Sequence, residues 1–138
     1  MSTRTMLQLV QSIAENLGAL EQGTATGGST TTVVCTDYPF KLTRANASNK
    51  TYEGAEIRVT DATNTAVVGT FEVSGYVANT GTFTLGSTAA FIIAATDTFD
   101  IYKRGIRYAD VYKAVNRALR RHYYRTLSPV SLLADADM

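Results

Sequence analysis

The chain has little of the residue types that most often carry chemistry. Its 138 residues include one cysteine, Cys35, one histidine, His122, and no tryptophan. One cysteine excludes a disulfide within the chain and is compatible with a reducing compartment. One histidine leaves a serine or cysteine nucleophile with a single source of general base, and a transition-metal site would depend on carboxylates alone. We therefore expect structural roles for both residues, no metal, no cofactor and no enzymatic activity.

Long apolar segments are also missing. No apolar run reaches the length of about 18 residues that a membrane-spanning helix needs. The N-terminal segment alternates apolar and polar residues, whereas a signal peptide has an unbroken apolar core. The sequence therefore predicts no membrane partner, and synthesis in a cytoplasm.

Glycine is concentrated in one stretch, GTATGGSTTTVVCT, which begins at Gly23 and resembles a linker or a phosphate-binding loop. A P-loop needs a lysine directly after its glycines, and here the next lysine is Lys41. The stretch also leads into a β-branched run at 30–36, whereas anion binding favours a helix N-terminus. We interpret it as a turn that leaves a helix and enters a strand, without a ligand.

Charge is unevenly distributed, although the formal net charge is only +1. Eight of the thirteen basic residues lie between positions 103 and 125, where Asp110 is the only acidic residue. The rest of the chain is net acidic, so this segment is the strongest polar signal in the sequence.

Two segments have helical periodicity. In the first, about 3–22, the apolar residues Met6, Val10, Ile13, Leu17 and Leu20 fall on one stripe, and Gly23 is the expected end of the helix. The second spans about 106–127, because Pro129 disfavours helical geometry at the residue before it. Residues 128–138 are then too few to fold alone and form an extended tail. The two helical stripes most simply bury each other.

Between the helices, short β-prone runs alternate with turn-rich pieces. Strands are expected within 30–36 and at 40–43, 55–60, 67–77, 81–86 and 99–104. Their close spacing favours a small antiparallel barrel or sandwich at about 30–104. The fold class is therefore α+β in a single domain of 138 residues, with N- and C-terminal helices packed together, a β insertion between them and a C-terminal tail.

The second helix presents a basic face, which is the main candidate for a functional surface. Its members are Lys113, Arg117, Arg120, Arg121 and Arg125. Such a stripe can contact nucleic-acid phosphates or an acidic protein surface. The acidic pairs Glu53–Glu56 and Asp97–Asp100 lie in polar segments and are interpreted as solvated charges.

Three stretches in this order resemble a known family: "LQLVQSIAENLG", "GTATGGSTTTVV" and "DTFDIYKRGIRYADVYKAVNRALRR". Together with the short tail, they resemble the head-to-tail connector, or adaptor, proteins in the neck of tailed bacteriophages. The resemblance implies a helical bundle, a homo-oligomeric ring of about a dozen copies under the portal protein, tail or nozzle proteins as further partners, and a channel in which DNA passes and is contacted non-specifically. It also implies residence in the virion after synthesis in the host bacterial cytoplasm.

The resemblance further implies that residues 127–138 dock on the portal. The candidate docking residues are Leu127, Pro129, Val130, Leu132 and Leu133, and a free tail is the alternative. Because adaptors are nearly all helical and this chain has a β-rich middle, another tail or tube subunit stays open. A nucleic-acid-binding module that uses the basic helix is the alternative from another class.

Overall fold

A computed structural model describes residues 5–37, 39–42 and 47–136. Within these ranges, side chains are described only up to His122. In the described part of the chain, two α-helices and seven strands make an α+β fold, as the sequence predicts. The elements in chain order are α1 (Met6–Asn16), β1 (Leu20–Thr24), β2 (Gly27–Gly28), β3 (Thr32–Val34), β4 (Glu56–Asp61), the 3-10 turn η1 (Thr65–Val67), β5 (Gly69–Val77), β6 (Thr82–Leu85), β7 (Thr98–Tyr102) and α2 (Tyr108–Ala136).

The strands form one antiparallel sheet in the order β1-β7-β4-β5-β6-β3-β2. One continuous stretch, residues 20–28, supplies both end strands, since β1 pairs with β7 and β2 pairs with β3. Ala25 joins the two pairings: its N–H donates to Asp97 and its carbonyl accepts from Thr96, while the Thr26 N–H donates to Val34. The expected antiparallel β insertion is thereby confirmed, and it begins at β1, ahead of the expected position 30.

One face of the sheet is apolar and packs into the main core. We call residues 19–102, which contain the sheet and this core, the β body. At its centre lie five buried rings, Phe40, Tyr52, Tyr76, Phe83 and Phe99. Their centroids are 4.9 to 6.1 Å apart, mostly in tilted or edge-to-face geometry, which adds to the free energy of burial. The β body is held together by its own side chains.

Helix α1 is shorter than its apolar stripe predicts. It begins with a capping box, in which Thr5 accepts from the Gln8 N–H and Gln8 accepts from the Thr5 N–H. It ends at Asn16 because Gly18 adopts a left-handed conformation with φ of 67° and its N–H bonds to Glu15. The predicted end at Gly23 is wrong, since Leu20 and Gly23 belong to β1.

Two further expectations about the β region need correction. Residues 40–42 are not a strand, because the N–H groups of Phe40 and Lys41 both donate to the Asp37 carbonyl and close a turn. That turn delivers the Phe40 ring to the core. Within the glycine-rich stretch, Gly23 and Gly28 lie in paired strands, so part of the predicted turn belongs to the sheet. At Gly23 a Cβ would lie 2.6 Å from the Phe40 ring, which explains the glycine.

The two helices pack together near the start of α2, as expected. Val10 of α1 is buried against Val111 and Val115 of α2. The structure describes α2 as continuing to Ala136, past the predicted end near Leu127 and through most of the predicted extended tail. Proline removes one N–H and perturbs one turn locally, and the surrounding leucines and alanines favour the helix.

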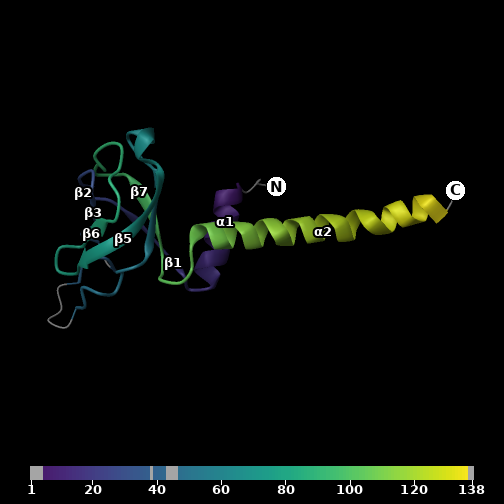
Figure 1. The fold of residues 1–138 in the computed structure, drawn as a ribbon, viewed down its shortest axis with the longest axis horizontal. Helices are drawn as coiled ribbons and strands as arrows, with labels where there is room; N and C mark the ends of the chain where they lie inside the picture. Colours follow the sequence, from purple (N-terminus) through teal and green to yellow (C-terminus); the bar gives the residue numbers. More distant parts are fainter. Residues whose placement is uncertain (1–4, 38, 43–46, 137–138) are drawn as a thin grey trace.

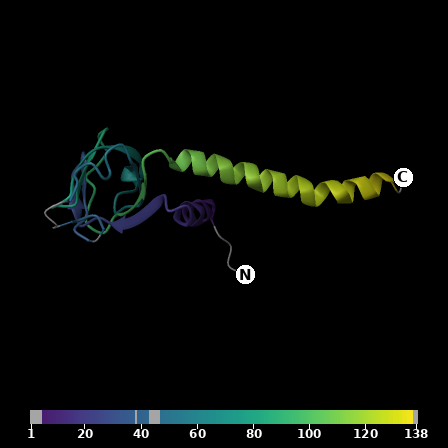
Figure 2. The same cartoon turned by 90° about the horizontal axis from the view of Figure 1, so that it is seen from below.

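The overall shape is a compact β body with one long projecting helix. Figure 1 shows the strands gathered at one end, with α1 crossing α2 close to the body. From the second direction, α2 extends far past α1, and the C-terminus lies at the end most distant from the β body (Figure 2). At 1.5 Å per residue, 29 residues give α2 a length of about 43 Å.

Candidate functional site

A polar joint connects the β body to the two helices. On the outward face of the sheet, Gln22, Asp100 and Arg58 stand side by side across β1, β7 and β4. Asp100 is buried and accepts hydrogen bonds from the amide groups of Gln11 on α1 at 2.7 Å and Gln22 at 3.2 Å. Burial raises the pKa of Asp100, partly offset by these two hydrogen bonds and by Arg58. The Asp100 side chain therefore links α1 to the sheet by a hydrogen bond, while burial of its carboxylate disfavours the charged form.

The start of α2 is fixed by β4. A Glu56 carboxylate oxygen accepts from the Tyr108 N–H at 2.9 Å, which places a negative charge at the helix N-terminus. The Arg58 guanidinium lies over the Tyr108 ring, 3.8 Å from its centroid. Together these contacts aim α2 away from the sheet.

The joint is less completely paired than the cores on either side of it. Among the described residues, the buried Nε of Arg58 and the buried hydroxyl of Tyr102 have no hydrogen-bond partner. Burial raises the pKa of Tyr102, and Asp100 raises it further. Each unpaired buried group costs about 1–3 kcal/mol of stability. The joint is therefore stabilised mainly by the packing of the small apolar cluster of Ala14, Leu20 and Tyr102.

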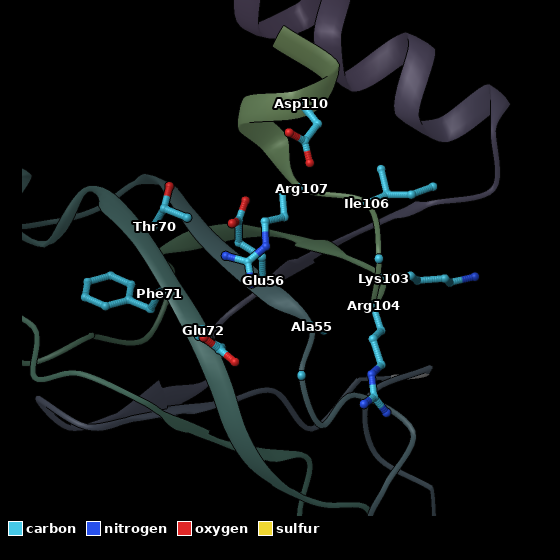
Figure 3. Close-up of a pocket in the computed structure, with 12 residues that line it drawn as sticks. Ala55, Glu56, Thr70, Phe71, Glu72, Lys103, Arg104, Ile106, Arg107 and Asp110 are labelled. Carbon is cyan, nitrogen blue, oxygen red and sulfur yellow. The ribbon is translucent and has the colours of Figure 1, made fainter. Parts of the chain in front are cut away.

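A cavity of about 560 Å³ opens beside this joint, between β4, β5 and the start of α2. Its charged lining mixes the carboxylates of Glu56, Glu72 and Asp110 with the cations of Lys103, Arg104 and Arg107. Figure 3 shows Lys103 and Arg104 pointing away from Glu56, while Arg107 and Asp110 descend from the α2 side. The described residues that line it include no histidine, cysteine or serine.

The predicted basic face lies on the exposed part of α2. Lys113, Arg117, Arg120 and Arg121 are all exposed, and none forms an ion pair with a described residue. Because they are three and four residues apart, they share one side of the helix, opposite Val111 and Val115. Arg125, the fifth predicted member, lies outside the described side chains. The structure therefore brings four of the five together on one exposed side of α2, where none of the four is paired with a described carboxylate.

Beside Arg117 and Arg121 the helix surface is hollowed. Ala114 and Ala118 form the floor of a shallow depression of about 370 Å³, and Arg117, Arg121 and His122 line its rim. The sequence offers a signal for this feature, two alanines four residues apart among long basic side chains, but spacing alone does not single it out.

The residues predicted to dock on the portal lie where the structure describes only the backbone. Leu127, Pro129, Val130, Leu132 and Leu133 lie within the α2 range, and their side chains fall outside the described ones. Their helical backbone replaces the extended tail, whereas their role in docking stays a prediction.

The two residues singled out for their rarity lie far apart. Cys35 is fully buried in the core of the β body, as expected, and its thiol donates to the Thr24 carbonyl at 3.1 Å. Burial raises the pKa of that thiol. His122 is exposed on the projecting part of α2, so the structure does not bring this pair together.

Sequence reasoning missed the roles of three carboxylates. Glu56 caps α2, Asp100 joins α1 to the sheet, and buried Asp97 accepts from the N–H groups of Thr63 and Ala94. The interpretation of these residues as solvated charges is wrong for Asp97 and Asp100, which are each 2% exposed. Apart from Ala94, which is three residues from Asp97, their donors come from distant segments, which no local pattern reveals.

Within the described ranges, no group of three or more His, Cys, Asp or Glu side chains could hold a metal ion. Neither described helix has the length and apolarity together that crossing a bilayer requires. Comparison with known protein families, curated proteins and solved structures found no match for this chain.

Proposed function

We propose that this protein is a non-enzymatic structural component of the neck of a tailed bacteriophage. Copies form a ring of about a dozen subunits that joins the portal to the tail and leaves a channel for DNA. The proposal combines the resemblance of the three sequence stretches with one structural observation, the length of α2 beyond its partner α1.

That observation carries the proposal because an unpacked helix is marginal in water. Val115 is the last described residue of α2 that is buried, and the six residues from Arg117 to His122 are all exposed. A helix that projects past its own fold supports a role in assembly with other chains. In the proposed neck, α2 and its end at residues 127–133 meet the portal, and the β body meets tail or nozzle proteins.

A finer point of architecture belongs to the same proposal. The stretch 20–28 pairs at one end with β7 and at the other with β3, so we propose that the sheet closes into a small barrel. Closure would remove the free strand edges along which antiparallel proteins aggregate, a property suited to a subunit held at high local concentration in a ring.

The test is the copy number of this chain in purified virus particles, measured by quantitative mass spectrometry against the portal protein. Parity with the portal is the expected result. Absence from particles would contradict the structural role, and hundreds of copies would assign the chain to a shell or tail tube.

A nucleic-acid-binding module remains the second candidate, because four exposed cations share one side of α2. Phosphate contacts weaken steeply with salt through counterion release, whereas apolar docking changes little. Titration with duplex DNA at low and high salt separates the two candidates.

A further inference from the structure

We propose that the part of α2 beyond α1 binds an amphipathic helix of another protein, whose apolar face is flanked by carboxylates. The inference deepens the proposed neck function. It rests on that function only for the expectation that the partner protein also belongs to the neck region of a bacteriophage. The binding surface consists of Leu119, which continues the stripe of Val111 and Val115, the hollow over Ala114 and Ala118 beside it, and Arg117 and Arg121 on the far rim of that hollow.

The apolar stripe of α2 is longer than the cover that α1 provides. Tyr108, Val111 and Val115 pack with α1 residues, whereas Leu119, four residues after Val115 and on the same side, is 47% exposed. In the sequence, apolar residues continue at three- and four-residue spacing through 123, 127, 130 and 133. A stripe of this length on one helix is typical of a surface that packs against a second helix.

Charge identifies the kind of helix. The segment from Val111 to His122 carries four cations and no acidic residue, and Lys113–Arg117 and Arg117–Arg121 are like-charge pairs four residues apart, which destabilise an isolated helix. Carboxylates on a partner helix would remove this repulsion and pair with arginine in bidentate geometry.

The shape of the surface agrees with a helix as the occupant. Alanines at 114 and 118 leave the depression of about 370 Å³, with Arg117, Arg121 and His122 at its rim. Small residues in the floor allow a second helix to approach closely, while the rim holds the cations beside it.

Two other occupants fit less well. A second copy of α2 on this surface would bring Arg117 and Arg121 near the same two cations of the other copy, and charge repulsion opposes that contact. Nucleic acid would satisfy the cations, but its phosphates would leave Leu119 and the stripe that follows it in water.

The experiment measures binding of synthetic peptides to the full-length chain by fluorescence anisotropy. The probe has about three heptads with leucine at the a and d positions and glutamate at e and g, where mutual repulsion hinders self-pairing. One control peptide carries lysine in place of glutamate, and a second keeps glutamate but has serine in place of leucine. A duplex DNA of similar length is measured in parallel, and sedimentation velocity follows self-association.

We expect saturable binding of the acidic leucine peptide, and binding at least about tenfold weaker for both control peptides and for DNA. Leu119→Glu and the double variant Arg117→Glu/Arg121→Glu should each weaken binding about tenfold or more. All three positions are exposed, so the fold should tolerate these changes. The matched controls are Leu17→Glu, an apolar residue 64% exposed outside α2, and Lys50→Glu, an exposed cation of the β body, and both should bind as the parent does.

Several outcomes would overturn the inference. These are no binding, equal binding of the lysine and glutamate peptides, a preference for DNA, and self-association that Leu119→Glu abolishes while the peptide does not bind. None of them depends on virus particles, so the neck assignment and this inference can fail separately. A chain with portal-like copy number that ignores the acidic peptide would retain the first and lose the second.

Discussion

The β body and the projecting part of α2 bury their side chains to very different degrees. In the β body, Phe40, Phe83 and Phe99 are each at most 1% exposed and contact one another. In α2, every described residue from Arg117 to His122 is exposed. One chain therefore contains a region stabilised by its own core and a region whose stripe lacks such cover among the described residues. The difference separates the part of the chain that is stabilised by its own core from the part that we propose assembles with other chains.

The largest expected effect comes from emptying the aromatic core. Phe83→Ala removes a fully buried ring that contacts Phe40, Tyr52, Tyr76 and Phe99, and we expect a loss of about 3–5 kcal/mol in the free energy of unfolding. Urea unfolding followed by circular dichroism measures it. A loss below about 1 kcal/mol would mean that the β body is not the stable part of the molecule.

The next effect concerns the turn that leads into β6. Gly81 has a φ of 65°, and a Cβ there would lie 1.9 Å from the Cys35 carbonyl oxygen. We expect Gly81→Ala to cost about 2–3 kcal/mol, since both the backbone conformation and the space are unsuitable. Gly27→Ala is the matched control, because a Cβ at Gly27 meets nothing within 4 Å. Equal stability of the two variants would contradict this packing.

Between the two regions, α1 links the β body to α2. Val10→Ala should cost about 2 kcal/mol by exposing Val111 and Val115. The change should appear first as faster hydrogen exchange at the start of α2, while the β strands keep their protection. Loss of protection in the strands at the same rate would show that body and helices unfold as one unit.

The joint should respond to pH through Asp100. Because burial raises its pKa above the ordinary value of 3.8, the folded state holds this proton more tightly than the unfolded state does. Its favourable contribution is therefore fully present below that ordinary value and is lost as pH rises through the folded pKa. Relative to Asp100→Asn, the parent should become less stable as pH rises from about 4 toward 7. A constant or opposite difference in urea unfolding would refute this.

The smallest effects are expected on α2 beyond α1. Leu119→Ala and Arg117→Ala should each change the free energy of unfolding by less than about 0.5 kcal/mol, because both side chains are exposed. Thermal unfolding of the isolated chain measures this. A large decrease in the free energy of unfolding of either variant would show that another part of the chain packs against the projecting helix.

The sequence predicts those features that depend on local periodicity. Strands near 55–60, 67–77 and 81–86 follow from β-branched alternation, and α2 from its apolar stripe. The failures involve residues whose roles come from distant partners. The helix α1 ends before Gly18 although its apolar stripe continues to Leu20, because Leu20 pairs with Tyr102 of β7. Asp100 and Glu56 owe their functions to α1 and to the start of α2, which lie 89 and 52 residues away in sequence.

The candidate surface is predictable in part. The spacing of Lys113, Arg117, Arg120 and Arg121 is enough to place them on one side of a helix. Whether that side faces the fold or the solvent depends on how α1 packs against Val111 and Val115. The hollow over Ala114 and Ala118 follows only from the projection of the helix past α1.

We propose that the chain contains a β body stabilised by its own core and a helix whose stability depends on another molecule. Hydrogen–deuterium exchange on the isolated full-length chain, resolved by residue, tests it most directly. We predict strong protection for the amides of β4, β5 and β7 and weak protection for those from Arg117 to His122. Protection of the α2 amides equal to that of the strands would contradict the claim, because it would show that the projecting helix is stable without a partner.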